Sequence, residues 1–207
     1  IVFPATYTLS QSITGNCNIG RTGVTIDGNG FTINGNITSS NGGTSSPGVN
    51  IEIVDTTITG TIIAGNGGGQ PNSPFVGATG GSVTITNSTV ASVSSGNGGV
   101  GGILPGFDGI GGNGGAISIT NSTHGSITSG NGGAGGQNDG SGGAISITKS
   151  SLNLSGLTIT AGSPGGSHGV VARSGTVSLT YSSISTNSST FIYNAHDLSI
   201  NSTSYGV

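Results

Sequence analysis

One sequence unit recurs along this chain of 207 residues, and it constrains the fold more than any other feature. The copy at 114–133 has the sequence GGAISITNSTHGSITSGNGG, and the copy at 80–99 has GGSVTITNSTVASVSSGNGG. Further copies begin at Gly142 and Ser174. Each copy starts with alternating apolar and polar residues, which is the period of a β-strand with one buried face. Self-similarity at intervals of a few tens of residues predicts a solenoid of stacked coils.

The corresponding apolar residues of successive copies are unevenly spaced. The interval runs from 21 residues (Val177 to Leu198) to 34 residues (Val83 to Ile117). Uneven spacing argues against a helical repeat, because a slip of one residue would rotate its apolar face. It suits a coil with a fixed strand part and a loop that tolerates insertions. The expected inward-facing pairs are Val24/Ile26, Ile51/Ile53, Val83/Ile85, Ile117/Ile119, Ile145/Ile147, Val177/Leu179 and Leu198/Ile200.

Three glycine-rich insertions account for the longer intervals. They occupy 65–81, 96–115 and 130–143, and each begins with GNGG. Such tracts are normally flexible linkers, so three mobile loops are one possibility. The insertions would, however, emerge one above another at one corner of the coils. They could then pack as extended or polyproline-II-like segments, in a layer that only glycine is small enough to form.

Composition excludes several classes of function. Only 4% of the residues are charged and the net charge is −3, without a basic patch, which argues against nucleic-acid binding. No apolar run approaches the roughly 20 residues needed to span a bilayer. Cys17 has no cysteine partner and is expected to be a small buried apolar residue. The first residue is Ile1, which suggests that the chain is processed. Together with the nearly uncharged composition, this predicts a secreted or cell-surface protein. No cofactor is expected.

The segments TYTLSQSITGN (6–16) and GVTIDGNGFTING (23–35) resemble the opening coils of the pectin-lyase-like right-handed parallel β-helix superfamily. The later VTITNST, ISITNST and VSLTYSS segments resemble its successive coils. The resemblance implies an all-β, single-stranded right-handed parallel β-helix, or β-solenoid, of about 7–8 coils. We expect one domain over 1–207, with 1–13 as an extended arm or first strand and the glycine-rich insertions at one corner. That fold carries lyases, hydrolases, adhesins and inert shafts alike, and we expect a non-catalytic, fibre-forming or adhesin member.

Carboxylates are the first candidates for chemistry, because sugar-cleaving members of this superfamily act through clustered acids. The chain has six acidic residues, and only Asp27, Glu52 and Asp55 are expected near one corner of adjacent coils. We interpret the two aspartates as turn residues and the glutamate as solvated. No catalytic residue is predicted.

Histidines are the second candidates. Ser167–Gly169 resembles the Gly-His-Gly element of polygalacturonase-type members, with His168 in the centre and Arg173 close behind. The carboxylates of that family are missing, because Asn121 and Lys149 occupy the corresponding coils. His124 and His196 lack partners at metal-ligand spacing and are interpreted as turn or surface residues, so no metal site is predicted.

Repeated polar positions are interpreted as structural. Asn87 and Asn121 are expected at equivalent corners, where their amides can hydrogen-bond along the stack. Outward Ser and Thr residues, such as Thr84/Thr86, form hydroxyl rows similar to those of ice-binding solenoids, although Glu52/Val54 interrupts them.

The two ends of the chain suggest how the protein functions. A solenoid must cap or pair its terminal coils, and neither end carries an amphipathic helix. We therefore predict head-to-tail self-assembly into an extracellular fibre or filament, a structural role without enzymatic activity. The alternatives are a glycan-binding adhesin module using Tyr181, Phe191 and Tyr193, a polysaccharide lyase or hydrolase, or an ice-binding protein. The residues predicted to form the assembly contacts are Ile1, Val2, Phe3, Tyr7, Leu198, Ile200 and Tyr205.

Overall fold

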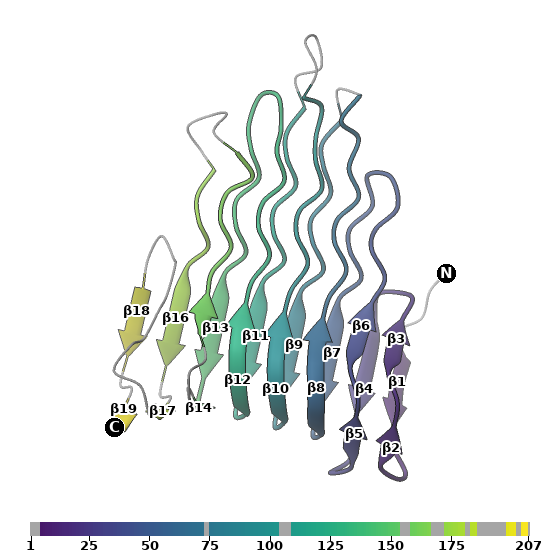
Figure 1. Ribbon diagram of the computed structural model, residues 1–207, viewed down its shortest axis with the longest axis vertical. Helices are drawn as coiled ribbons and strands as arrows, with labels where there is room; N and C mark the ends of the chain where they lie inside the picture. The colour runs from purple at the N-terminus through teal and green to yellow at the C-terminus, as the bar shows by residue number, and fades with distance from the viewer. Residues whose placement is uncertain are drawn as a thin grey trace.

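The protein is an all-β solenoid of parallel strands (Figure 1). The computed structural model describes residues 5–72, 75–103, 109–153, 158–166, 172–180, 183–185, 198–201 and 204–206. The described residues include no helix and form two parallel sheets. The predicted fold class is confirmed.

The first sheet has eight strands, and each strand opens one coil. Neighbouring strands are parallel and in register, so that Val83 pairs with Ile51 on one side and with Ile117 on the other. The inward-facing pairs expected from the sequence therefore stack on one another. The strands are, in spatial order, β1 (Ala5–Thr8), β4 (Val24–Asp27), β7 (Ile51–Val54), β9 (Val83–Thr86), β11 (Ile117–Thr120), β13 (Ile145–Thr148), β16 (Val177–Thr180) and β18 (Leu198–Asn201).

The second sheet has eleven strands and faces the first across a narrow core. Three short strands, β3 (Cys17–Ile19), β6 (Ile37–Ser39) and β15 (Ile159–Thr160), extend it beside the main path. The main path runs through β2 (Ile13–Thr14), β5 (Thr32–Asn34), β8 (Thr57–Ile63), β10 (Thr89–Ser94), β12 (Thr123–Thr128), β14 (Ser151–Asn153), β17 (Ser183–Ser185) and β19 (Ser204–Gly206).

The core consists of columns of side chains, most of them β-branched, that run along the stack. Isoleucine and valine suit this arrangement because their stiff side chains pack well on a pleated surface. One column of the first sheet contains Ile53, Ile85, Ile119 and Ile147, each at most 1% exposed. A column of the second sheet joins Ile13, Ile33, Ile58, Val90 and His124. The backbone register continues from this column to Leu152, Ile184 and Tyr205.

A repeated corner joins the two sheets within each coil. Asp55, Asn87, Asn121 and Lys149 occupy equivalent corners, with φ between 49° and 51°. Asn and Asp tolerate this left-handed conformation better than most side chains, whereas Lys149 adopts it without that advantage. The Asn121 amide nitrogen donates to Asn87 Oδ1 at 2.7 Å, which confirms the predicted amide contact.

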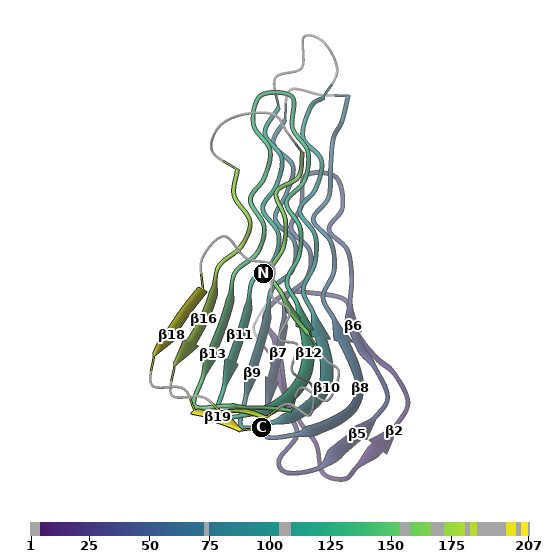
Figure 2. The ribbon, with the colours of Figure 1, turned by 60° about the vertical axis from the view of Figure 1, so that its left-hand side comes forward.

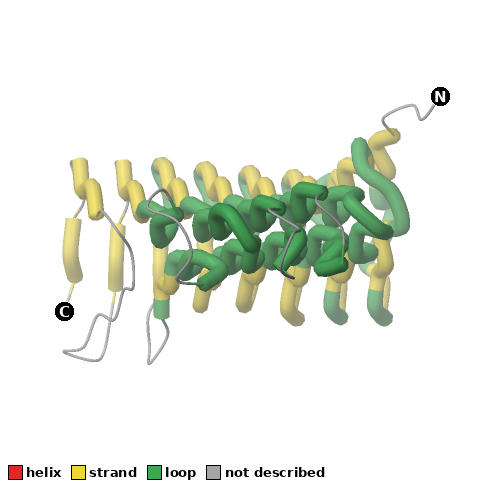
Figure 3. The backbone as a smooth tube through the Cα atoms, turned by 90° about the horizontal axis from the view of Figure 1, so that it is seen from above, coloured by secondary structure: helices red, strands yellow, loops and turns green. Residues whose placement is uncertain are grey.

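The glycine-rich insertions leave the solenoid at one corner and form a two-layered slab beside the sheets (Figures 1 and 2). Each insertion runs out from the second sheet, turns, and returns to the next strand of the first sheet. Figure 3 shows the outgoing and returning runs from above as two layers. This glycine slab comprises the outgoing runs 40–46, 64–70, 95–103, 129–137 and 161–166 and the returning runs 47–50, 75–82, 109–116, 138–144 and 172–176.

Hydrogen bonds within each layer join neighbouring runs along the stack. In the outgoing layer, Gly67 N–H donates to Asn97 O and Gly98 N–H donates to Asn131 O, both at 2.8 Å. The returning layer repeats this pattern with N–H donors from Gly48, Gly80, Gly114 and Gly142.

Further hydrogen bonds cross between the two layers. Gly96 N–H donates to Gly81 O at 2.9 Å, and Gly115 N–H donates to Gly96 O at 2.8 Å. Gly143 N–H donates to Gly130 O at 2.8 Å in the same way. The layers are thus bonded to each other as well as internally.

Close packing of the backbones explains why these runs consist of glycine. Extended polyproline-II-like segments form no internal hydrogen bonds, so their polar groups must be satisfied by neighbouring segments. A Cβ atom added at Gly96 would lie 1.9 Å from Gly65 O, and most slab glycines meet a neighbouring carbonyl in the same way. Of the two alternatives for the insertions, the packed layer is confirmed. The slab also includes the runs at 40–50, 161–166 and 172–176, outside the three predicted insertions.

Candidate assembly interface

The N-terminal end of the solenoid presents a strand edge with no neighbour among the described residues. β1 pairs only with β4. Ala5 N–H donates to Gly23 O and Leu9 N–H donates to Asp27 O, both at 2.9 Å and both toward the second coil. Because N–H and C=O groups alternate in direction along a strand, those of Thr6 and Thr8 point away from the stack. The edge is therefore open to a further parallel strand.

An apolar cavity of about 290 Å³ opens at the same end. It is lined by Tyr7, Leu9, Ile13, Cys17 and Arg21, among other residues. This end cavity is the uncovered end of the core columns, because the equivalent side chains one coil further along are buried. In the column of the first sheet, the exposed fraction falls from 53% at Tyr7 to 8% at Ile26.

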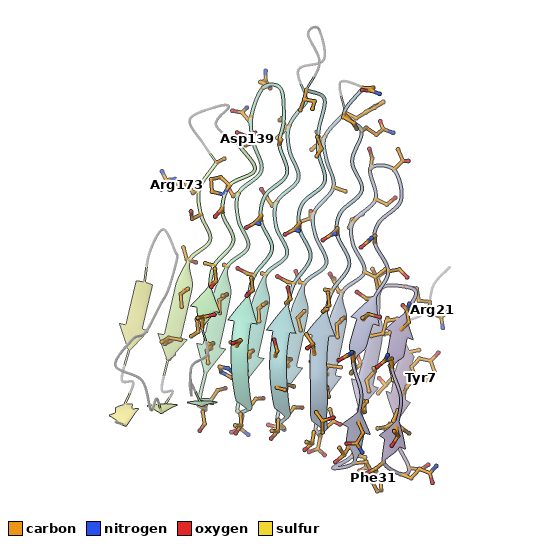
Figure 4. All side chains as sticks on the ribbon, in the orientation of Figure 1. Tyr7, Arg21, Phe31, Asp139 and Arg173 are labelled. Atoms are coloured by element: carbon orange, nitrogen blue, oxygen red, sulfur yellow. The ribbon has the colours of Figure 1, made fainter. Side chains whose placement is uncertain are left out.

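Two polar side chains that line the end cavity, Tyr7 and Arg21, lie near each other at this end of the solenoid (Figure 4). Arg21 Nη2 donates a hydrogen bond of 3.3 Å to the Tyr7 hydroxyl, and both side chains are exposed. Cys17 is half-buried beneath them and packs against the core, and burial raises the pKa of its thiol. The predicted apolar environment of Cys17 is found, but at an open end of the core.

The C-terminal end presents the opposite edge. β18 pairs with β16, with Leu198 opposite Val177 and Ile200 opposite Leu179. β19 pairs with β17, with Tyr205 opposite Ile184. Neither terminal strand has a second neighbour among the described residues.

The predicted assembly residues thus fall into two groups. Tyr7 lies in the first strand of one sheet, and Leu198, Ile200 and Tyr205 lie in the last strands of the two sheets. Residues 5–8 of the segment expected as an arm or first strand form β1. Ile1, Val2 and Phe3 lie outside the described residues.

The acidic residues at the corner of the first coils have separate structural partners. Asp27 Oδ1 accepts a hydrogen bond of 2.9 Å from Asn29 N–H, which fixes a turn. Glu52 Oε2 accepts one of 2.7 Å from Thr25 Oγ1, on the outer face of the first sheet. Asp55 occupies a left-handed corner. Among the described residues, no group of three His, Cys, Asp or Glu side chains could hold a metal ion.

The candidate His168 element lies outside the described residues, as do Tyr181, Phe191 and Tyr193. Arg173, which follows His168, belongs to the returning layer of the glycine slab. Its carbonyl accepts a hydrogen bond of 2.8 Å from Gly142 N–H, and its own N–H donates to Ser141 Oγ at 3.2 Å.

The expectation that His124 lies in a turn or on the surface is wrong. His124 is 1% exposed and occupies the second-sheet column between Val90 and Leu152. Its Nδ1 lies 3.3 Å from Gly125 O, and its Nε2 has no hydrogen-bond partner among the described residues. Burial lowers the pKa of His124 from 6.5 to about 4, opposed only by the Gly125 carbonyl, so the ring is neutral at pH 7.

The outer face of the slab carries a row of asparagines whose role the sequence alone did not reveal. A polyproline-II-like run has three residues per turn, so every third residue of an outgoing run faces outward. Asn97 N–H donates to Asn66 Oδ1, and Asn131 N–H donates to Asn97 Oδ1, both at 2.8 Å. Each asparagine side chain therefore accepts a hydrogen bond from the backbone N–H of the equivalent asparagine in the next coil. The repeated GNGG at the start of each insertion is the signal that could have predicted this row.

Comparison with models of known protein families, with curated proteins and with solved structures finds no match. The β-solenoid is therefore established by the structure, whereas membership of the pectin-lyase-like superfamily stays a prediction. No helix among the described residues is long and apolar enough to span a membrane.

Proposed function

We propose that this protein is the structural subunit of an extracellular fibre, in which copies assemble end to end by continuing the stack of coils. The observation that carries the proposal is the N-terminal end, where a strand edge that has no neighbour among the described residues borders an open apolar cavity. Exposed strand edges and apolar cavities are both surfaces that soluble monomers usually cover. A second copy would cover both at once.

The charge distribution also favours end-to-end association. Only nine of the 207 residues are Asp, Glu, Lys or Arg: six are acidic and three are basic. Repulsion between stacked copies is therefore weak, and assembly needs no counter-charged partner. The partner of this surface is another copy of the same chain.

Replacing Tyr7 with lysine is expected to block assembly. Tyr7 lies in an inward column but is exposed in the free subunit, so the change costs the monomer little. In a stack the lysine would be buried without a partner, at a cost of several kcal/mol. Since each 1.4 kcal/mol is a factor of ten, the critical concentration for assembly should rise by about 100-fold or more, measured by sedimentation.

The matched control is Thr6→Lys, which places the same charge on the adjacent, outward-facing position of β1. This variant should assemble at nearly the concentration of the wild type. Equal assembly of both lysine variants, or no sedimenting species from the wild type, would contradict the proposal.

A second candidate function, glycan binding, is favoured by a shallow groove of about 390 Å³ on the outer face of the slab. Exposed amides of Asn97 and Asn131 lie one coil apart along it, suited to donate to sugar hydroxyls.

Asn97→Asp keeps the structural Oδ1 acceptor and removes the amide donor. If the groove binds polysaccharide, the Asn97→Asp variant should bind immobilised polysaccharide at least about tenfold more weakly than the wild type, with unchanged thermal stability. Equal retention of the variant and the wild type would exclude this role for Asn97.

A further inference from the structure

We infer that the joint between copies is head-to-tail and has a single register, with β18 of one copy pairing in parallel with β1 of the next. Leu198 then lies opposite Ala5, and Ile200 lies opposite Tyr7. The inference rests on the proposed end-to-end assembly and specifies the surface of the partner.

The first argument is the constancy of the register inside the stack. In every pair of neighbouring strands in the first sheet, the first inward position of one strand lies opposite the first inward position of the other. This register holds from Ala5 opposite Val24 to Val177 opposite Leu198. A shift by one residue would turn every inward side chain of the added strand outward. The corners oppose a shift by two, because Asn87 N–H donates to Thr120 O at the same point of each coil.

The second argument is the direction of the hydrogen-bonding groups. Inside the stack, inward residues donate to the following coil, as Val83 N–H does to Ala116 O at 2.9 Å. By the same alternation, the N–H and C=O groups of β18 that face away from the described coils belong to Leu198 and Ile200. Those of β1 belong to Thr6 and Thr8. Continuing the pattern gives three bonds, from Thr6 N–H to Leu198 O, from Ile200 N–H to Thr6 O and from Thr8 N–H to Ile200 O.

The third argument is that the second sheet specifies the same joint. The column that contains Ile13, Ile33 and Ile58 ends, by register, at Tyr205 in β19. Stacking with Leu198 opposite Ala5 brings Tyr205 opposite Ile13, at the end cavity. Both sheets would have to slip together for any other register to form.

Cysteine pairs across the joint test this register. Thr6→Cys with Ser199→Cys, in a Cys17→Ser background, places two cysteines opposite each other on adjacent strands. Adjacent strands lie about 4.8 Å apart, within the Cα separation that a disulfide tolerates. The control pair, Thr8→Cys with Ser199→Cys, is offset by two residues and separated by about 8 Å, which is too far.

Oxidation of assembled 6/199 protein should give a ladder of covalent oligomers on a non-reducing denaturing gel, at least tenfold stronger than from the 8/199 pair. Fibres that form without this difference would overturn the register but leave the proposed function standing. Covalent dimers from Thr6→Cys alone would show head-to-head pairing and overturn the polarity. A wild-type protein that does not assemble at all would overturn the proposed function, and the inference with it.

Discussion

Replacing Gly99 with alanine is expected to lower the free energy of unfolding by about 3 kcal/mol or more, at the upper end of the range for overpacking. The added Cβ would lie 2.1 Å from Gly68 O and 2.5 Å from Gly68 C. Both atoms belong to a backbone that is hydrogen-bonded on several sides, so the slab cannot yield locally. For a chain of this length the melting temperature should fall by about 6–12 °C, measured by differential scanning calorimetry.

Gly43→Ala is the matched control, because Gly43 also lies in an outgoing run. A Cβ at Gly43 would meet no atom within 4 Å, and its φ is not in the left-handed region. Alanine restricts the unfolded chain more than glycine does, so this variant should be as stable as the wild type or slightly more stable. Similar melting temperatures for the Gly99 and Gly43 variants would mean that the runs are loose loops in solution.

Replacing His124 with leucine is expected to reduce the loss of stability between pH 7 and pH 4 by about 3 kcal/mol. The pKa of His124 is lowered to about 4 in the folded protein, against 6.5 in the unfolded chain. Protons therefore bind preferentially to the unfolded chain as the pH falls below 6.5, and the folded state loses stability until the pH reaches about 4. The difference of 2.5 pKa units corresponds to about 3 kcal/mol.

Leucine fills a similar volume in a column of aliphatic residues and leaves no buried nitrogen without a partner. The variant should therefore be at least as stable as the wild type at pH 7, and the gap should widen by about 3 kcal/mol at pH 4. Urea unfolding of both proteins at each pH measures this difference, because the remaining titratable groups are the same in both. Parallel pH profiles for wild type and variant would contradict the burial of the neutral ring.

The fold could be predicted from the sequence because its strand pattern is repeated in register. The alternation at Val83/Ile85, Ile117/Ile119 and Ile145/Ile147 fixes which face is buried, and the varying intervals locate the insertions. Packing of the glycine runs could be proposed but not decided, since glycine-rich sequence alone is equally typical of linkers. The slab runs at 40–50, 161–166 and 172–176 were missed because Ser, Thr and Pro dilute their glycine content.

His124 shows a different limit. Aligning TNSTVASVSS with TNSTHGSITS places His124 at the position of Val90, and thus in the core column. That signal was present, but a polar residue in a Ser/Thr-rich segment was interpreted from its residue type instead of its register. The end cavity could not be predicted, because the sequence shows which residues point inward but not which coil lacks a cover.

Cryo-electron microscopy of the concentrated protein tests most directly whether the coils continue from one copy into the next. Eight coils spaced at about 4.8 Å predict filaments with an axial repeat of about 38 Å, strands perpendicular to the axis, and the glycine slab as a lateral ridge. Particles no longer than one subunit at every concentration, or filaments in which the solenoid axis lies across the fibre, would contradict end-to-end stacking.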